Sequence, residues 1–251
     1  MKALVTGASS GIGRDIAYVL ANKGYDLILV ARRSELLEEL KSTLSTNAKI
    51  ITADLSDENQ CFDLYEKTKN EDIDILVNNA GFGVFGEFVS SNLERELDMI
   101  NVNVRAVHIL TKLFLKDFVV KDKGHVLNVA SIAAFYAGPL FSGYYASKNY
   151  VLRLSQAISE ELKSKKSNVK ISVLCPGPVD TEFNKAANVK FALKGLNSMD
   201  VAQYAVKKML KGKLIIIPGA IVRMAKTFSP LISDNIKMKF LHSVQKQKAD
   251  K

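Results

Sequence analysis

Residues 3–13 read Ala3-Leu4-Val5-Thr6-Gly7-Ala8-Ser9-Ser10-Gly11-Ile12-Gly13. The apolar start predicts a short buried strand, and a helical pattern follows the last glycine. We expect Gly7 to allow a tight exit from the strand, Gly11 to let the backbone approach an anion, and Gly13 to let the helix pack closely. The first amides of a helix have no partner within it, so they can bind phosphate groups. This stretch therefore predicts a strand–turn–helix phosphate site.

Apolar runs and amphipathic helical patterns alternate along almost the whole chain. This alternation predicts an α/β fold with a doubly wound, mostly seven-stranded parallel sheet, helices on both faces, and ligands at the carboxyl ends of the strands. The chain has 251 residues and is 47% apolar, so residues 1–251 can form one domain with a large core. The strands are expected near residues 2–6, 26–31, 48–52, 74–77, 125–130, 169–174 and 213–217.

A Tyr and a Lys on one helix face form a candidate proton donor. Tyr144 and Lys148 lie one helical turn apart, and Ser131 lies thirteen residues before the Tyr. A phenol has an ordinary pKa of about 10, and we expect the neighbouring ammonium to lower it toward the working pH. The spacing by itself is weak, because residues four apart share a face in every helix.

The glycine spacing Gly-x-x-x-Gly-x-Gly differs from the common Gly-x-Gly-x-x-Gly fingerprint. With this spacing the chain resembles the short-chain dehydrogenase/reductase family, whose active site is a Ser, Tyr, Lys and Asn set. The resemblance implies a Rossmann fold and hydride transfer between a nicotinamide cofactor and a carbonyl or secondary alcohol. Further matching positions occur in the right order: Asp54-Leu55, Asn78-Asn79-Ala80-Gly81 and Pro176-Gly177 with Thr181 follow predicted strands, and Asn103 lies early in a predicted helix.

The resemblance also implies a role for each member of the catalytic set. Tyr144 would donate the proton, and Ser131 would hydrogen-bond the substrate oxygen. Lys148 would hold the nicotinamide ribose, and Asn103 would hold a water that links this Lys to solvent. Tyr145 is not expected to take part, because it has no Lys four residues further on.

The end of the second predicted strand indicates which cofactor is used. An NAD site usually has an acidic residue there, whereas this chain has Ala31 followed by Arg32 and Arg33. A guanidinium can form a bidentate pair with a 2′-phosphate, so we predict NADP(H) with Arg32 as its main ligand. For Arg33, a simple solvated position at a helix start stays open. The expected cofactor-binding residues are Gly7, Ser9, Ser10, Gly11, Ile12, Gly13, Arg32, Arg33, Asp54, Leu55, Asn79, Ala80, Gly81, Tyr144, Lys148, Pro176, Gly177, Val179 and Thr181.

Some of these residues also have a purely structural alternative. By resemblance Asp54 accepts from the adenine amino group, but it could instead cap the helix that begins near Ser56. Residues 78–81 contact the adenosine and brace the sheet in the family, but they could form only a turn. Thr181 and the Val179 backbone are implied to hold the nicotinamide carboxamide.

Apolar loops near residues 82–85 and 135–137, Pro178 and residues 183–196 indicate a hydrophobic ketone or alcohol as substrate. Substrates within the family include ketoacyl thioesters, steroids, sugars and small carbonyl compounds. The sequence therefore leaves two activities open, a hydroxysteroid dehydrogenase and a 3-ketoacyl reductase. Residues 184–198 are expected to form a substrate lid. We also expect a homodimer or homotetramer.

The net charge of +9 is concentrated near the end of the chain. Residues 207–251 carry eleven Lys or Arg and two Asp, whereas residues 1–206 carry 24 charges of each sign. For the basic tail, residues 219–251, three alternatives stay open: a subunit contact or active-site cover, weak contact with an anionic membrane, and a nucleic-acid surface. We expect no nucleic-acid partner, because no helix-turn-helix, zinc or stacking-aromatic pattern is present.

The remaining reactive side chains indicate no further chemistry. Cys61 and Cys175 lack metal-ligand spacing and are expected to be reduced thiols of a cytoplasmic protein, without a bound metal. His108, His125 and His242 are scattered and expected in the core or at the surface. The chain starts on a strand, so we expect no secretory signal. A nonenzymatic NADP-binding sensor is the alternative, and the complete Asn, Ser, Tyr and Lys set argues against it.

Overall fold

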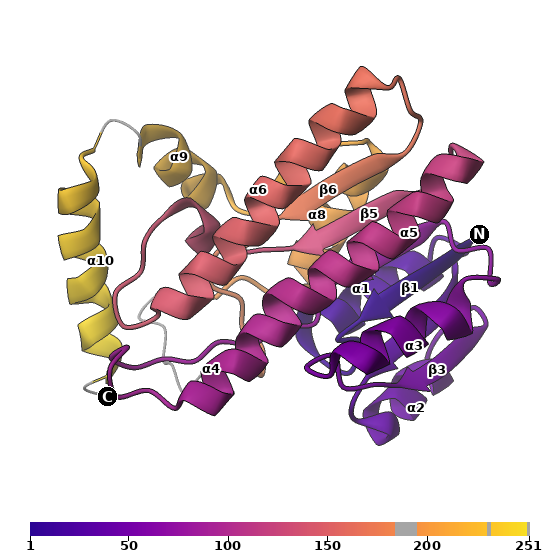
Figure 1. The fold of residues 1–251 in the computed structure, drawn as a ribbon, viewed down its shortest axis with the longest axis horizontal. Helices are drawn as coiled ribbons and strands as arrows, with labels where there is room; N and C mark the ends of the chain where they lie inside the picture. Colours follow the sequence, from indigo (N-terminus) through magenta and orange to yellow (C-terminus); the bar gives the residue numbers. More distant parts are fainter. Residues whose placement is uncertain (184–194, 230–231, 250–251) are drawn as a thin grey trace.

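The computed structural model describes residues 1–183, 195–229 and 232–249, and its centre is a sheet of seven parallel strands (Figure 1). The strand order is β3-β2-β1-β4-β5-β6-β7, which confirms the doubly wound α/β architecture. Six strands lie within one residue of their predicted positions, and the seventh is shorter than expected. The strands are β1 (Lys2–Thr6), β2 (Asp26–Ala31), β3 (Ala48–Thr52), β4 (Ile75–Asn78), β5 (His125–Val129), β6 (Lys170–Leu174) and β7 (Ile215–Ile216).

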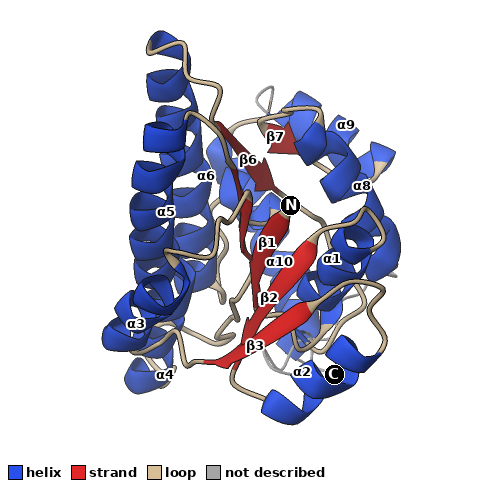
Figure 2. Ribbon diagram, turned by 90° about the vertical axis from the view of Figure 1, so that its right-hand side faces the viewer, coloured by secondary structure: helices blue, strands red, loops and turns tan. Residues whose placement is uncertain are grey.

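Helices cover both faces of this sheet (Figure 2). One layer contains α3, α4, α5 and α6, and the other contains α1, α2 and α8. Their bounds are α1 (Gly11–Ala21), α2 (Ser34–Ser42), α3 (Glu58–Thr68), α4 (Leu93–Ile100), the π-helix η1 (Asn101–Ala106), α5 (Val107–Lys121), the 3₁₀ helix η2 (Ile132–Phe135), α6 (Ser142–Ser164), α8 (Ser198–Leu210), α9 (Ala220–Phe228) and α10 (Asp234–Ala249).

The central strands are apolar on both faces because each face is covered. Leu4 packs into the core beneath α3 and α5, whereas its neighbours Ala3 and Val5 pack into the core beneath α1 and α8. Successive strand residues point to opposite sides, so a strand between two helix layers needs apolar residues at every position. This explains why these strands appear in the sequence as short continuous apolar runs.

The direction of winding reverses at β1, and this position creates the site. β1 pairs with β2 on one side and with β4 on the other, so the loops after β1 and β4 leave the sheet toward opposite faces. A crevice opens between such loops at the carboxyl edge of a parallel sheet. The glycine turn follows β1 at this point, and residues 79–81 follow β4.

The basic tail folds into α9 and α10, which lie at one end of the molecule beside the start of α6 (Figure 1). Gln245 of α10 is buried, so this helix packs against the domain. No described helix has the length and apolar character needed to cross a membrane. Of the predicted lid, residues 184–194 lie outside the described residues, while Leu196 pairs with Val179 and Asn197 caps α8.

Candidate active site

A cavity of about 570 Å³ lies at the carboxyl edge of the sheet. It is lined by every residue predicted for the catalytic and cofactor sites except Gly13 and Asn103. One end contains Arg32, Asp54 and Leu55, and the other contains Tyr144 and Lys148, with the glycine turn between them. This order of groups fits a dinucleotide that lies across the edge of the sheet.

The glycine turn needs its glycines for two physical reasons. Gly7 has φ +64° and Gly11 has φ +54°. This left-handed backbone conformation is unfavourable for residues that carry a Cβ atom. A Cβ at Gly11 would lie only 3.0 Å from the Thr181 side chain, which closes over the turn. A Cβ at Gly13 would overlap the Asn79 amide and the Gly7 carbonyl oxygen. Gly13 therefore makes room for the residues that brace the turn, not for the cofactor.

Asn79 braces the turn from the neighbouring strand. Its side-chain nitrogen donates to the carbonyl oxygens of Thr6 and Gly7, both at 3.1 Å. The Thr6 hydroxyl accepts from the backbone amides of Asn79 at 3.0 Å and Ala80 at 3.2 Å. These bonds join the ends of β1 and β4, so residues 78–81 have a bracing role that goes beyond a simple turn.

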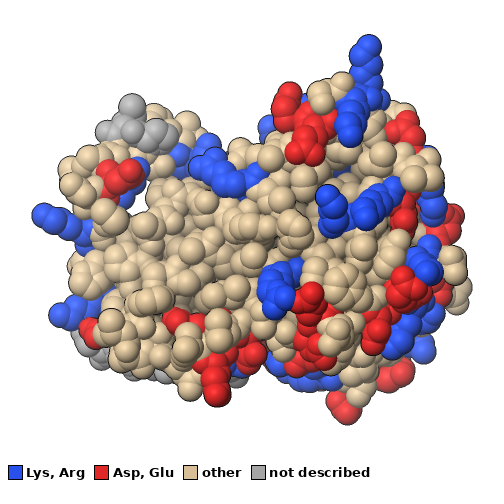
Figure 3. All heavy atoms as spheres, in the orientation of Figure 1, with Lys and Arg blue, Asp and Glu red and all other residues tan. Residues whose placement is uncertain are grey.

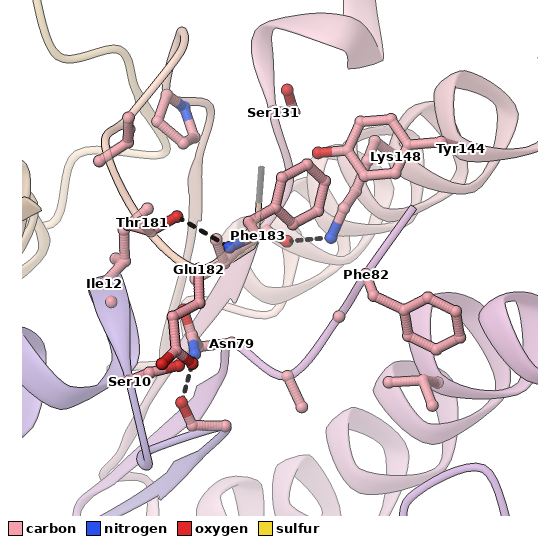
Figure 4. Close-up of a pocket in the computed structure, with 18 of the residues that line it drawn as sticks. Ser10, Ile12, Asn79, Phe82, Ser131, Tyr144, Lys148, Thr181, Glu182 and Phe183 are labelled. Carbon is pink, nitrogen blue, oxygen red and sulfur yellow. Dashed lines mark hydrogen bonds between the residues drawn. The ribbon is translucent and has the colours of Figure 1, made fainter. Parts of the chain in front are cut away.

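The start of α6 places the predicted proton donor on the cavity wall. Tyr144 is 8% exposed and Lys148 is 4% exposed, so both are shielded from water. The Lys148 ammonium donates to the Val129 carbonyl oxygen at 3.0 Å and lies 5.8 Å from the centre of the Tyr144 ring. Ser131, which follows β5, lies on the hydroxyl side of Tyr144 (Figure 4). The three side chains therefore meet at one end of the cavity.

The pKa values in this group differ from the prediction. Burial raises the pKa of Tyr144 above its ordinary value, and the hydrogen bond with Ser131 offsets only part of this effect. Burial also lowers the pKa of Lys148 to about 8. The prediction that Lys148 lowers the pKa of the phenol is therefore wrong for this structure. Loss of hydration destabilises both charged forms, and at 5.8 Å from the ring the ammonium does not compensate.

Asn103 lies behind the cavity wall, in the π-helix between α4 and α5, and it is fully buried. Its amide nitrogen donates to the Phe82 carbonyl oxygen at 2.8 Å and to the Ser147 hydroxyl at 3.1 Å. Its amide oxygen accepts from the Phe82 backbone amide at 3.1 Å. A Cβ at Gly81 would lie 2.8 Å from this oxygen and 3.2 Å from the Lys148 nitrogen. Asn103 therefore fixes the loop after β4 against α6, close to the Lys.

The two arginines at the end of β2 have different partners. Arg33 donates to the hydroxyls of Ser9 and Ser10 at 3.3 and 3.2 Å and forms an ion pair with Glu182 at 2.7 Å. The Glu182 side chain lies over the glycine turn beside Ser10 (Figure 4). Arg32 instead lies 3.6 Å from the Asp54 carboxylate. The sequence favoured Arg32, whereas the structure brings Arg33 onto the glycine turn.

Asp54 organises its own loop and is not a helix cap. Its carboxylate accepts from the Ser56 amide at 3.0 Å and the Ser56 hydroxyl at 2.8 Å. The cap of α3 is Asp57, which accepts from the Asn59 amide at 2.9 Å. Burial raises the pKa of Asp54, but the bonds from Ser56 and the charge of Arg32 outweigh it, so the net pKa is lowered. An ionised carboxylate therefore lies at this end of the cavity.

The opposite end of the cavity has an aromatic wall. The rings of Phe141 and Tyr144 stack with centroids 4.5 Å apart, and Phe183 lies 5.4 Å from the same Tyr. Phe82 and Phe183 were expected here, but residues 135–137 do not line the cavity, because Phe135 packs into a separate core. Sequence reasoning missed the lining residues Phe141, Val244 and Gln245 because no motif marks them.

Cys61 and Cys175 are free and buried, and burial raises their pKa values to about 11 and about 12. Neither thiol is therefore activated at neutral pH. His125 is buried and bonds to the Ser172 hydroxyl at 2.8 Å, and neither residue lines the cavity. Within the described ranges no three His, Cys, Asp or Glu side chains are grouped to hold a metal ion.

Comparison with known proteins identifies the family. The sequence profile of the short chain dehydrogenase family matches residues 1–191. The 17-beta-hydroxysteroid dehydrogenase type 3 of Homo sapiens is 35% identical over 200 residues, 76% of this chain and 63% of the human protein. An uncharacterized oxidoreductase of Staphylococcus epidermidis is 31% identical over 208 residues, 81% of this chain and 90% of that protein. A solved short-chain dehydrogenase from Sphingobium yanoikuyae in complex with NADPH has a TM-score of 0.82 and 27% identity, over 92% of this chain and 93% of that chain.

The chain therefore belongs to the short-chain dehydrogenase/reductase family, as its glycine spacing predicted. It is an oxidoreductase of CH–OH or C=O groups that uses a nicotinamide cofactor. The residues that match the family include every predicted site residue, whereas α8, α9 and α10 lie beyond them.

Proposed function

We propose that the chain reduces a hydrophobic ketone with NADPH, or oxidises the corresponding alcohol with NADP, and uses Tyr144 for proton transfer. The observation that carries this proposal is the meeting of Tyr144, Ser131 and Lys148 at the end of a cavity that also contains the glycine turn. Bound NADPH supplies a hydride to the carbonyl carbon. The side chains supply the proton and the orientation.

Each group has a separate task in the reduction. Burial keeps Tyr144 protonated at neutral pH, so its hydroxyl can donate a proton to the carbonyl oxygen as negative charge develops there. The Ser131 hydroxyl, on the same side of the cavity, can hydrogen-bond this oxygen. Lys148 is held by the Val129 carbonyl and can bind the cofactor ribose. Asn103 acts indirectly, because it holds the Phe82 loop in place.

The contacts of the arginines support NADP(H) as the cofactor. No acidic residue ends β2, and Arg33 reaches across to the hydroxyls of Ser9 and Ser10. A 2′-phosphate could replace the Glu182 carboxylate as the anionic partner of Arg33, and Arg32 lies beside it. The match to a solved relative with NADPH also supports this assignment.

Cofactor preference can be tested by replacing each arginine. We expect Arg33→Ala to lower kcat/KM for NADPH by about 10- to 100-fold, the loss of a charge-assisted hydrogen bond, with little change for NADH. Arg32→Ala should have a smaller effect, because Arg32 lies 63% exposed and 3.6 Å from Asp54. Equal losses of kcat/KM with NADPH and NADH would show that Arg33 does not bind the 2′-phosphate.

The aromatic wall supports a bulky apolar substrate. Phe141 and Phe183 lie against the Tyr144 ring, and Phe82 and Tyr145 also line the cavity. Two relatives carry names that specify 17-beta-hydroxysteroids and very-long-chain 3-oxoacyl-CoA. We therefore propose a steroid ketone or a long-chain 3-ketoacyl thioester over a sugar or a small polar carbonyl.

A panel of steroid ketones, 3-ketoacyl thioesters, sugars and small carbonyl compounds, each assayed with NADPH and with NADH, tests this function. Oxidation of NADPH should follow only with the apolar compounds, measured as loss of nicotinamide absorbance. If NADPH binds but no compound is turned over, a nonenzymatic NADP-binding sensor would replace the enzyme.

We also propose that the chain forms a homodimer or homotetramer. Leu93, Leu97 and Ile100 are 66%, 50% and 39% exposed on α4, at spacings that bring them onto one helix face. A second copy packed on this face would remove these side chains from water. Light scattering of the purified chain measures the number of subunits.

A further inference from the structure

The C-terminal helices combine exposed apolar side chains with the positive charge of the chain. On α9, Met224 and Phe228 lie one turn apart and are 59% and 57% exposed. On α10, Ile236 and Phe240 lie one turn apart and are 61% and 67% exposed. Single exposed apolar residues are normal, but several within one short segment mark a surface that contacts a partner.

The orientation of α10 is fixed, so its apolar outer face is a constant feature of the molecule. Gln245 is only 2% exposed and donates to the Tyr145 hydroxyl at 2.9 Å, and Val244 lines the cavity. Gln245 lies about 180° around the helix from Ile236 and about 140° from Phe240, so these two side chains stay exposed while Gln245 faces the domain. The inner face of α10 therefore closes the substrate end of the cavity, and its outer face points away from the domain.

Positive charge surrounds these apolar side chains. Residues 220–249, which contain both helices, carry six Lys or Arg and a single acidic residue, Asp234, which pairs with Lys237 at 2.6 Å. Lys239 and Lys246 form no ion pair with any residue that the structure describes. Figure 3 shows Lys and Arg side chains at the outer edge of this end of the molecule, together with a few Asp and Glu side chains.

Charge decides which partner fits this surface. A second copy would bring the same excess of positive charge against it, and like charges in contact are unfavourable. An anionic lipid surface offers both a negative potential and an apolar layer beneath the headgroups. We propose that the outer face of α9 and α10, defined by Met224, Phe228, Ile236 and Phe240, docks on the surface of an anionic lipid bilayer.

Docking would place the substrate cavity at the lipid surface. Val244 and Gln245 line the cavity from the helix whose outer face contacts lipid. An apolar ketone dissolved in the bilayer could then enter the cavity without first dissolving in water. This consequence rests on the proposed function, whereas the lipid contact itself does not.

The docking can be tested without measuring activity, by sedimentation of the full chain with lipid vesicles. We expect the chain to pellet with vesicles of phosphatidylcholine mixed with phosphatidylglycerol, but not with pure phosphatidylcholine. Salt at about 1 M should release it, because the Debye length falls to about 3 Å. Equal binding to both kinds of vesicle would overturn the charge argument.

Variants of the outer face locate the contact. Ile236→Ser with Phe240→Ser should weaken binding to anionic vesicles by about tenfold or more, because less apolar area enters the lipid. The matched control is Val120→Ser with Phe62→Ser, which changes exposed apolar residues of α5 and α3 and should bind like the unmodified chain. All four positions are exposed, so unchanged thermal unfolding is expected.

A charge variant keeps the test independent of the apolar substitutions. Lys239→Gln with Lys246→Gln should also weaken binding and reduce its salt dependence, whereas Lys23→Gln with Lys165→Gln on other surfaces should not. Wild-type binding by the α10 variants would overturn the proposal. So would a dimer that forms without lipid and is lost in the Ile236→Ser and Phe240→Ser variant, because a second copy would then occupy this face.

Discussion

Two adjacent tyrosines at the start of α6 have separate tasks because their partners differ. Tyr144 lies with Ser131 and Lys148, whereas the Tyr145 hydroxyl accepts from Gln245 at 2.9 Å. Burial raises the pKa of both phenols, so both are protonated at neutral pH. The two tyrosines therefore do not differ in ionisation. They differ in their position relative to Ser131 and Lys148.

This difference predicts opposite outcomes for the same substitution. Tyr144→Phe removes the proton donor and should lower kcat by at least about 100-fold, while NADPH binding measured by fluorescence titration stays within a few-fold. Tyr145→Phe should keep substantial activity, because it loses only the bond to Gln245. Loss of turnover in Tyr145→Phe with full activity in Tyr144→Phe would reverse the assignment.

His125 should make stability depend on pH. Burial lowers its pKa to about 4, below the ordinary value near 6.5, so the unfolded chain binds the proton more readily between these values. Stability contributed by the neutral His is thus present above pH 6.5 and is lost as pH falls toward 4. Urea unfolding should show a loss of about 2 kcal/mol from pH 7 to pH 5 that is absent in His125→Asn. Equal losses in both proteins would exclude His125 as the cause.

At the scale of elements, the conformation of the glycine turn depends on the residues that follow β4. Asn79 holds the carbonyl oxygens of Thr6 and Gly7, and Gly13 leaves space for that amide. The turn and the loop after β4 therefore behave as one unit. A change at Gly13 should disturb the cofactor site although Gly13 does not line the cavity.

Gly13→Ala tests this coupling. The added methyl would overlap the Asn79 amide, so we expect a loss of about 1–3 kcal/mol in stability and weaker NADPH binding. Gly24→Ala is the control, because its φ is +80° but a Cβ there meets no atom within 4 Å. It should lose about 1 kcal/mol and bind NADPH normally. Normal NADPH binding by Gly13→Ala would show that the turn does not depend on Asn79.

At the scale of the whole molecule, the tail completes the substrate end of the cavity. Gln245 comes from α10, a hundred residues after Tyr145 in the chain, and their bond joins the tail to α6. The bond between Gln245 and Tyr145 supports one of the alternatives for residues 219–251, namely that the tail covers the active site. Substrate selectivity should therefore depend on α10, which lies outside the residues that match the family.

A double-mutant cycle measures this coupling. Gln245→Ala and Tyr145→Phe should each raise KM for a bulky apolar ketone with a smaller change in kcat, because they loosen the cavity wall and leave the proton donor in place. The double variant should be no worse than the more affected single variant, since both break one bond. Additive effects would show that the two residues act independently.

Much of the fold and of the site could be predicted from local patterns. The seven strands follow from short apolar runs between helical periods, and the glycine turn follows from a spacing within thirteen residues. Tyr144 and Lys148 were found because a helix brings residues four apart onto one face. The localisation and the lid at residues 184–198 stay predictions.

Other features depend on which distant segments meet, and only the tertiary structure decided them. Arg33, not Arg32, reaches the glycine turn because β2 ends beside the loop after β1. Val244 and Gln245 reach the cavity because α10 packs back on the start of α6. Burial, which no local pattern reports, raises the pKa of Tyr144. The sequence by itself therefore determined the order of elements and the family motifs, whereas long-range packing decided the contacts, the burial and thus the pKa values.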